Sequence, residues 1–270
     1  MFPSPHTAVR PARVQRRLAG VGRTARNVAR HAGQMGILAG RIVVATLSGR
    51  VALRDLLVQM QLMGIQSLPI VLITAMLAGV VTSQQGGYQF TGSVPLYVLG
   101  SVVASSVVLE LGPVLTAIVL VGRVGARITA ELGTMQVSEQ IDAMHSLGRD
   151  PVQILAAPRV LAGMITVPLL VGIANCVGIL SGMVAAQATV GLAPSGFLYG
   201  AGLFWHNWDM FYSLMKGLVF GTAIPFIAVH MGIATRGGAE GVGRATTSSV
   251  VFMTLAVLVL DALFPPLLLQ

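Results

Sequence analysis

The chain has 270 residues, of which 54% are hydrophobic and only 10% are charged. Soluble domains carry about 25% charged residues, so this composition excludes a soluble enzyme and a disordered regulator and indicates a membrane protein. A net charge of +8 is compatible with nucleic-acid binding, but whether it indicates such binding depends on where the cations lie along the chain.

The first 34 residues form a strongly basic N-terminal arm. Ten arginines precede the first acidic residue, Asp55. No uninterrupted apolar stretch with a small-residue cleavage pattern follows the charges, so the arm does not resemble a secretory signal peptide. An organellar transit peptide is an alternative. A cytoplasmic arm lying on anionic lipid needs fewer assumptions.

Residues 35–60 are expected to form an amphipathic helix in the plane of the membrane interface. Apolar residues recur here at helical spacing, and three arginines interrupt them. Such a helix buries one face in the lipid boundary and keeps its cations in water.

The remaining residues, 61–270, are expected to form a domain of five transmembrane helices. Long uncharged runs, punctuated by glycine and proline, each exceed or match the roughly 20 residues that one span needs. A β-barrel is not expected, because short segments of alternating hydrophobicity are missing. The spans are predicted near residues 62–84, 96–121, 161–187, 211–235 and 250–269.

The cations fall on one side of these spans. They lie in the N-terminal arm and the interfacial helix that follows it, in the loop after the second span and in the loop after the fourth, and the single lysine, Lys216, lies within the fourth span. Cytoplasmic loops collect lysine and arginine, so we expect a cytoplasmic N-terminus and a C-terminus on the opposite side. Topology then accounts for the net charge, and no nucleic-acid partner is expected.

Three charged residues lie inside predicted spans: Glu110, Lys216 and Asp261. A charge at the bilayer centre costs roughly 2.5 to 3.5 kcal/mol on insertion scales, so such residues usually face a cavity or a partner. Because Lys216 is the only cation in the spans, we expect it to pair with Glu110. The alternative keeps Glu110 protonated against backbone groups while Lys216 extends outward to water. Asp261 lies near the end of its span, where we expect slight burial.

The loop between the second and third spans is predicted to hold an amphipathic cytoplasmic helix at about residues 131–148. Its methionine-bearing apolar stripe is flanked by acidic residues, a pattern that suits a groove on a soluble partner. A surface helix resting on the bilayer is the alternative. The candidate contact residues are Glu131, Met135, Glu139, Gln140, Asp142 and Met144.

Signatures of catalysis and of nucleotide binding are missing from the sequence. The only lysine lies inside a span rather than in a phosphate-binding loop, and the five histidines are never three or four residues apart. We therefore expect no enzyme activity, no metal and no cofactor in this chain. The single cysteine, Cys176, cannot form an internal disulfide.

The sequence Glu-Leu-Gly-Pro-Val at residues 110–114 is the core of a recognisable motif, and further residues of the same motif run through the central loop from Arg123 to Arg159. The residues of the motif outside this region are Gln85-Gly86, Lys216, Arg244-Ala245-Thr246-Thr247 and Leu260-Asp261. At these residues the chain resembles the MlaE family, also called YrbE, the membrane subunits of bacterial ABC lipid transporters. The resemblance covers the chain from about Leu47 to its end.

The resemblance implies an all-α membrane fold with an interfacial helix and five transmembrane helices, in the bacterial inner membrane with the C-terminus periplasmic. It implies a homodimer, a cytoplasmic ABC ATPase that binds ATP and Mg²⁺ and contacts the loop helix, a periplasmic MCE-domain protein and a lipid substrate. It also implies a lipid cavity beside Glu110 and Lys216, for which the further candidates are Leu109, Val80, Val81 and Gln85. Family members commonly carry an arginine where this chain has Leu109, which favours Lys216 as the partner of Glu110.

The expected function is therefore that of a permease that moves phospholipid or a related lipid between the inner membrane and an MCE-domain carrier, driven by a separate ATPase. An ion-coupled secondary transporter using Glu110 and Asp261 is the main alternative, although such proteins often show an inverted repeat, which we do not find here. An intramembrane enzyme is a third alternative, for which a catalytic pair is missing.

Overall fold

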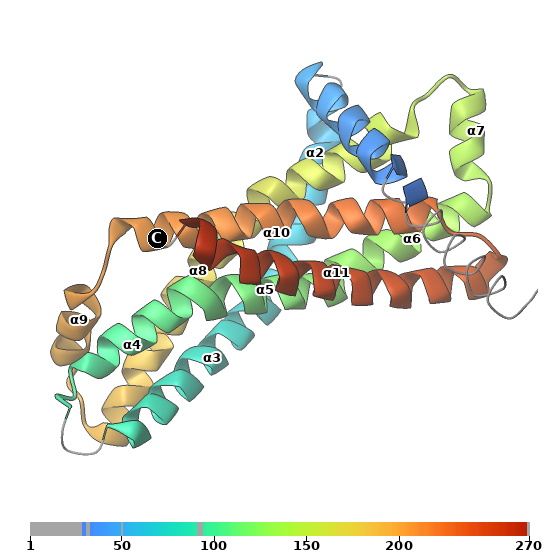
Figure 1. The fold of residues 1–270 in the computed structure, drawn as a ribbon. Helices are drawn as coiled ribbons and strands as arrows, with labels where there is room; N and C mark the ends of the chain where they lie inside the picture. The colour runs from blue at the N-terminus through green and yellow to red at the C-terminus, as the bar shows by residue number, and fades with distance from the viewer. Residues whose placement is uncertain (1–28, 31–32, 50, 91–93, 269–270) are drawn as a thin grey trace, which may run out of the picture. The chain divides into compact units, whose positions relative to one another are not determined.

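A computed structural model describes residues 29–30, 33–49, 51–90 and 94–268. Most of the basic arm, residues 1–28, lies outside the described residues. The chain forms two compact units, Met1–Arg41 and Ile42–Gln270, and an apolar helix covers Gly33–Leu47. The described residues contain helices and no strand (Figure 1).

Five helices of the second unit are long and apolar enough to cross a membrane, which confirms the predicted number. Several are built from shorter α-helical and π-helical segments that follow one another along one long helix. The bounds are Leu53–Gln89 (α2 Leu53–Met60, η1 Gln61–Ile65, α3 Leu68–Gln89), Val98–Val137 (α4 Val98–Ser106, η2 Val107–Leu111, α5 Gly112–Leu120, η3 Val121–Gly125, α6 Ala126–Val137), Val152–Val190 (η4 Val152–Ala156, α8 Ala157–Val190), α10 Asn207–Ile233 and α11 Gly238–Leu268. Two shorter helices, α7 Gln140–Ser146 and α9 Pro194–Leu203, lie between them.

The helix expected over residues 35–60 differs in the structure. It ends at Leu47, and Gly49 adopts a left-handed turn conformation with φ +62°, which glycine reaches without strain. Residues 53–60 form α2, the beginning of the first long helix. Hydrophobic periodicity alone did not reveal this boundary, because apolar residues continue on both sides of the turn.

The cytoplasmic helix expected over residues 131–148 is also divided. Its first part is the end of α6, and its second part is α7. Glu139 separates them with φ 59°, the only positive φ of a non-glycine residue in the described chain. A left-handed residue cannot continue an α-helix, so the chain turns here.

Glycines hold the long helices close together. A Cβ atom on Gly79 of α3 would overlap the backbone of Gly178 in α8, and one on Gly163 of α8 would overlap the backbone of Gly221 in α10. Small residues allow such backbone contact. In a bilayer, lipid tails are as apolar as the side chains, so close van der Waals packing rather than the hydrophobic effect holds the helices together. α8 therefore lies between α3 and α10 (Figure 1).

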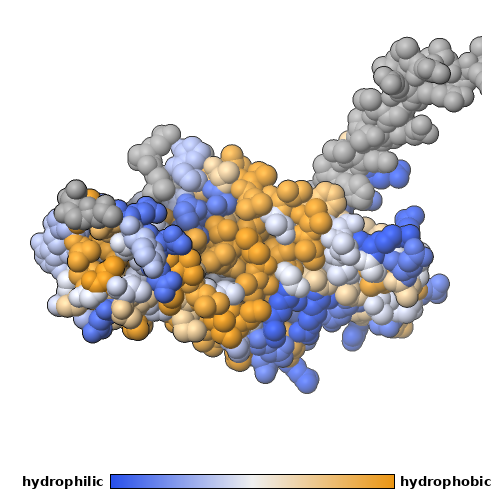
Figure 2. Space-filling model, turned by 90° about the horizontal axis from the view of Figure 1, so that it is seen from below, coloured by the Kyte–Doolittle hydropathy of each residue, from blue (hydrophilic) through white to orange (hydrophobic). Residues whose placement is uncertain are grey.

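The surface of this unit is largely apolar. Figure 2 shows a broad hydrophobic area across the middle of one face, with hydrophilic residues around it. Exposed side chains include Leu77, Val81, Leu169, Phe252 and Val259, each more than half exposed. Soluble monomers rarely expose patches of this kind, so the surface suits lipid or a partner chain.

Candidate functional site

The three charged residues of the spans meet at Lys216, in the second unit. Its Nζ lies 2.8 Å from Glu110 Oε2 and 2.7 Å from Asp261 Oδ1. The three residues come from η2, α10 and α11, three different long helices. The structure thus brings Glu110 and Lys216 together and adds Asp261, for which the sequence predicted slight burial near the end of the last span. We refer to Lys216, Glu110 and Asp261 as the ion cluster.

Burial in the ion cluster is uneven. The Lys216 side chain is fully buried, whereas that of Glu110 is 45% exposed and that of Asp261 is 21% exposed. A buried ammonium costs several kcal/mol unless partners surround it, and here two carboxylates do so. The surface that remains accessible is therefore acidic, with the cation behind it.

Two further groups contact the Lys216 ammonium. It donates a hydrogen bond to the backbone carbonyl of Leu109 over 3.0 Å, and it lies 4.9 Å from the centre of the Tyr212 ring. A cation over an aromatic face gains about 0.5 to 2 kcal/mol, and more as water is excluded. Leu109, predicted as a cavity residue, thus acts here through its backbone oxygen.

A proline explains why the Leu109 carbonyl is available. In a regular α-helix this oxygen would accept from the N–H of residue 113, but residue 113 is proline and has no N–H. The helix forms the π-segment η2, Val107–Leu111, directly before Pro113. Such π-segments are frequent at functional sites. The sequence signal was the Glu-Leu-Gly-Pro motif.

A buried polar contact lies next to the ion cluster along the chain. The Asn175 amide donates to the Ser213 hydroxyl over 2.8 Å, and both residues are almost fully buried. Ser213 precedes Lys216 by less than one helical turn. A Cβ on Gly112 would overlap the Asn175 side-chain oxygen, so Gly112 lets α8 approach the helix that carries Glu110. The sequence reasoning missed this contact, since neither Asn175 nor Ser213 is charged.

The remaining cavity candidates lie on α3. Val80 is half-buried, while Val81 and Gln85 are exposed. None of the ion pairs or hydrogen bonds of the described residues joins them to the ion cluster. Their role in a lipid cavity stays a prediction.

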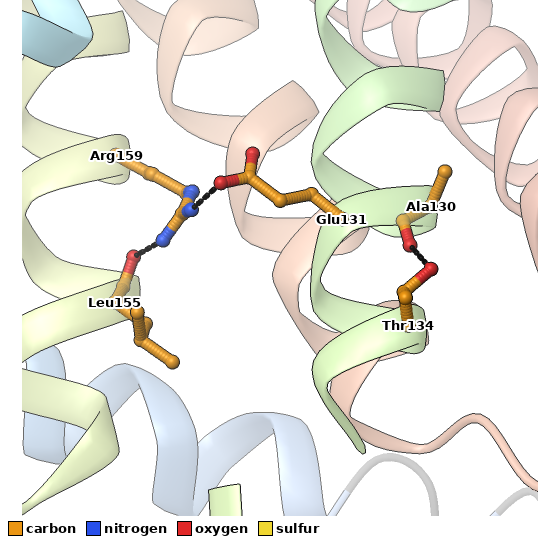
Figure 3. Close-up of polar contacts among 5 residues, drawn as sticks. All are labelled: Ala130, Glu131, Thr134, Leu155 and Arg159. Carbon is orange, nitrogen blue, oxygen red and sulfur yellow. Dashed lines mark hydrogen bonds and ion pairs between the residues drawn. The ribbon is translucent and has the colours of Figure 1, made fainter. Parts of the chain in front are cut away.

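A second ion pair lies where α6 meets the third long helix. The Arg159 guanidinium is 2.9 Å from Glu131 Oε1 and donates to the Leu155 carbonyl over 2.7 Å (Figure 3). The Arg159 side chain is 4% exposed and that of Glu131 is 43% exposed. Glu131, predicted to contact an ATPase, thus already holds a partner within the chain.

The other residues predicted for an ATPase contact lie around the turn and on α7. Glu139, Gln140 and Asp142 are exposed, while Met135 and Met144 are partly buried. The Ile141 side chain is buried and Leu147 is 78% exposed. The short helix α7 thus packs against the rest of the chain through Ile141 and carries exposed acidic side chains around it. Its docking role stays a prediction.

Among the described residues, no group of three or more His, Cys, Asp or Glu side chains is placed to hold a metal ion.

Comparison with known proteins identifies the family. The model of the family described as Permease MlaE matches residues 56–266, which include all five long helices almost entirely. This chain belongs to the MlaE permease family. The resemblance first noted on the Glu-Leu-Gly-Pro motif is thereby confirmed, and so is the helical membrane fold.

Several relatives of this MlaE-family permease are named as probable ABC transporter permease proteins. A probable ABC transporter permease protein of Synechocystis sp. is 40% identical over 222 residues, which cover 82% of this chain and 84% of that protein. Another from Rickettsia typhi is 37% identical over 210 residues, 78% of this chain and 81% of the relative. The chloroplastic protein TRIGALACTOSYLDIACYLGLYCEROL 1 of Arabidopsis thaliana is 36% identical over 225 residues, 83% of this chain and 64% of the plant protein. The last name refers to a glycerolipid.

Proposed function

We propose that this chain is the permease subunit of an ABC transporter that moves phospholipid or a related lipid between the bacterial inner membrane and a periplasmic MCE-domain carrier. Two copies form the membrane passage, and a cytoplasmic ATPase, which binds ATP and Mg²⁺, supplies the energy. The N-terminus lies in the cytoplasm and the C-terminus in the periplasm.

The observation that carries the proposal is the ion cluster within an otherwise apolar set of spans, in a chain of the MlaE family. Glu110 and Asp261 are accessible while Lys216 is buried. A passage for lipid needs apolar walls for the acyl chains and a few polar groups for the headgroup. The cluster supplies such groups, contributed by three long helices that relative motion would separate or bring together.

The size of the lipid explains why a covered route is needed. Exposing two acyl chains of about 16 carbons to water costs roughly 25 kcal/mol at about 0.8 kcal/mol per methylene. Noncovalent affinity saturates near about 18 to 21 kcal/mol. The lipid must therefore keep apolar cover during transfer, and coupling to ATP hydrolysis gives the transfer a direction.

Force from the ATPase would enter through the turn at Glu139 and through α7. The exposed acids of this segment suit a cationic groove on a soluble partner. The Glu131–Arg159 ion pair fixes the end of α6 against the third long helix. A push on α7 is thus passed to two spans at once.

The ion-coupled alternative finds no supporting observation. Glu110 and Asp261 share the single ammonium of Lys216, which occupies the position that a coupling cation would take between them. A sodium ion or proton would have to displace a fully buried lysine.

Purification and reconstitution test the proposal. The full-length tagged chain should retain an ATPase and an MCE-domain protein after mild solubilisation. In proteoliposomes, the complex should transfer a fluorescent phospholipid only with ATP. The double variant Glu139→Ala/Met144→Ala should keep ATP hydrolysis and lose lipid transfer, whereas Glu240→Gln, an exposed acid elsewhere, should retain both. Lipid transfer driven by a sodium or proton gradient without ATP would contradict the proposal.

A further inference from the structure

A small basic cavity lies away from the ion cluster, between the first and second long helices. Its volume is about 110 Å³, and residues 59–66 form one wall while residues 123–131 form the other. The polar side chains that line it are Gln59, Gln66, Arg123, Arg127 and Glu131. At about 30 Å³ for each water, this is room for roughly three or four waters or one compact anion.

The two arginines of this cavity have no counter-ion within the described chain. Arg123 and Arg127 are four residues apart and so share one face of the helix. Neither forms an ion pair or hydrogen bond with a described residue. The acid in the cavity, Glu131, is already bound to Arg159, and Arg127 repels the Arg159 guanidinium.

The chemistry of the lining selects a phosphate. Two guanidinium groups offer paired N–H donors that match phosphate oxygens, and charge-assisted bonds of this kind are about twice as strong as neutral ones. The carboxamides of Gln59 and Gln66 add N–H donors on the opposite wall. A carboxylate ligand would leave several of these donors unused.

The depth of the cavity points to a lipid as the source of the phosphate. Arg123 follows Glu110 by 13 residues, about 20 Å along the helix at 1.5 Å per residue, which places it toward the cationic end of the spans. On another face of the first long helix, Leu57 and Ile65 are more than half exposed and border an open apolar groove of about 370 Å³. Basic pockets between spans at this level bind anionic headgroups.

We propose that the cavity of Arg123 and Arg127 binds the phosphate of an anionic phospholipid in the leaflet at the basic end of the spans. This lipid stays bound to the permease and is distinct from the transported lipid, because the ion cluster proposed to bind the transported headgroup lies elsewhere along the same long helix. Binding neutralises the two arginines and bridges the first and second long helices. The site does not depend on which lipid the permease moves.

Native mass spectrometry of the purified complex tests this site. The probes are dihexanoyl phosphatidylglycerol, dihexanoyl phosphatidylcholine and inorganic phosphate, each titrated against the full-length protein. The wild type should prefer phosphatidylglycerol, and Arg123→Gln/Arg127→Gln should weaken its binding roughly tenfold or more, since about 1.4 kcal/mol per lost charged contact is tenfold. Arg149→Gln/Arg236→Gln removes two exposed arginines outside the cavity and should bind as the wild type does.

A second variant guards against misfolding. Arg123→Lys/Arg127→Lys keeps the charge but loses the paired donors, so its affinity for phosphatidylglycerol should fall between those of the wild type and the glutamine variant. Equal phosphatidylglycerol binding by all variants would overturn the site. Inorganic phosphate that competes as well as the lipid would overturn the lipid assignment. Loss of a co-purified ATPase with unchanged lipid preference would show that the arginines contact protein instead. ATP-driven transfer is measured separately, so failure of the site leaves the proposed function standing.

Discussion

Lys216 donates a hydrogen bond to the backbone carbonyl of Leu109. In a regular α-helix this carbonyl would accept from the N–H of residue 113, but Pro113 has no N–H. The proline thus removes the competing N–H, and the lysine takes its place. An apparently helix-breaking residue is in this way part of the polar site, since it frees an acceptor that the lysine from another helix uses.

The substitution Pro113→Ala should weaken this arrangement. The new N–H competes for the Leu109 carbonyl, so the Lys216 ammonium loses its neutral acceptor. We expect lower lipid transfer while the free energy of unfolding changes by only about 1 kcal/mol. Hydrogen exchange should show a protected amide at residue 113. Pro69→Ala, at an exposed helix start, is the control, and full transfer activity despite a protected amide at 113 would refute the role of the proline.

The two acids of the ion cluster should show strong non-additivity. Glu110→Gln and Asp261→Asn each leave Lys216 one carboxylate, so we expect each to cost about 1 kcal/mol or less. The double variant leaves a fully buried ammonium without an anion, which costs about 3 to 5 kcal/mol. Adding Lys216→Met to the double variant should recover most of this loss. Unfolding free energies in a double-mutant cycle provide the measurement, and additive effects would mean that the acids act independently.

Much of the fold could be predicted because membranes impose simple constraints. The five spans follow from long uncharged runs, and the proximity of Glu110 to Lys216 follows from the lack of any other cation in the predicted spans, which are shorter than the long helices of the structure. The contact of Asp261 with Lys216 was not predicted, because its position close to the end of its span suggested slight burial; in the structure the Asp261 carboxylate on α11 reaches Lys216 on α10.

Other features depend on contacts that no local pattern encodes. The burial of Arg159 requires both Glu131 and the Leu155 carbonyl, which lie on two different long helices. The helix α9 lies outside every predicted span, in a stretch rich in glycine and proline. Gly200 of α9 lies against the backbone of Tyr97, a contact that only a small residue permits. The turn at Glu139 carries no glycine to reveal it.

The Glu131–Arg159 ion pair should respond unequally to loss of either partner. Glu131→Ala leaves the buried guanidinium with only the Leu155 carbonyl, which we expect to cost about 2 to 3 kcal/mol. Arg159→Met leaves a partly exposed carboxylate that water can solvate, so the cost should be about 1 kcal/mol. Chemical unfolding of the two variants compares them directly. A larger loss for Arg159→Met would show that the packing of the arginine side chain outweighs its charge.

Close helix contact should make one glycine far more sensitive than another. In Gly163→Ala, the new methyl group meets the backbone of Gly221, so α8 and α10 must separate; we expect a loss of about 1 to 3 kcal/mol. In Gly243→Ala, the methyl group meets nothing within 4 Å, and helix propensity should add up to about 1 kcal/mol. Thermal unfolding midpoints should move in opposite directions. Similar shifts for both variants would contradict the backbone contact.

Variants of Glu139 can distinguish the role of its backbone in the turn from the role of its side chain in contacting the ATPase. Its φ of 59° strains a residue with a Cβ, so Glu139→Gly should raise the free energy of unfolding by about 1 kcal/mol. If the carboxylate also contacts the ATPase, the same variant should lower lipid transfer per ATP hydrolysed. Glu139→Asn, which tolerates this conformation, should show the same uncoupling. Normal coupling in both variants would assign Glu139 to the turn alone.

We propose that this permease moves lipid only when a separate ATPase drives it. The most direct measurement is transfer of a fluorescent phospholipid between liposomes that hold either the purified chain alone or the chain with its co-purified partners. We expect transfer with the complete complex and ATP, and none with the chain alone or with a non-hydrolysable nucleotide. Equal transfer by the isolated chain without ATP would contradict it.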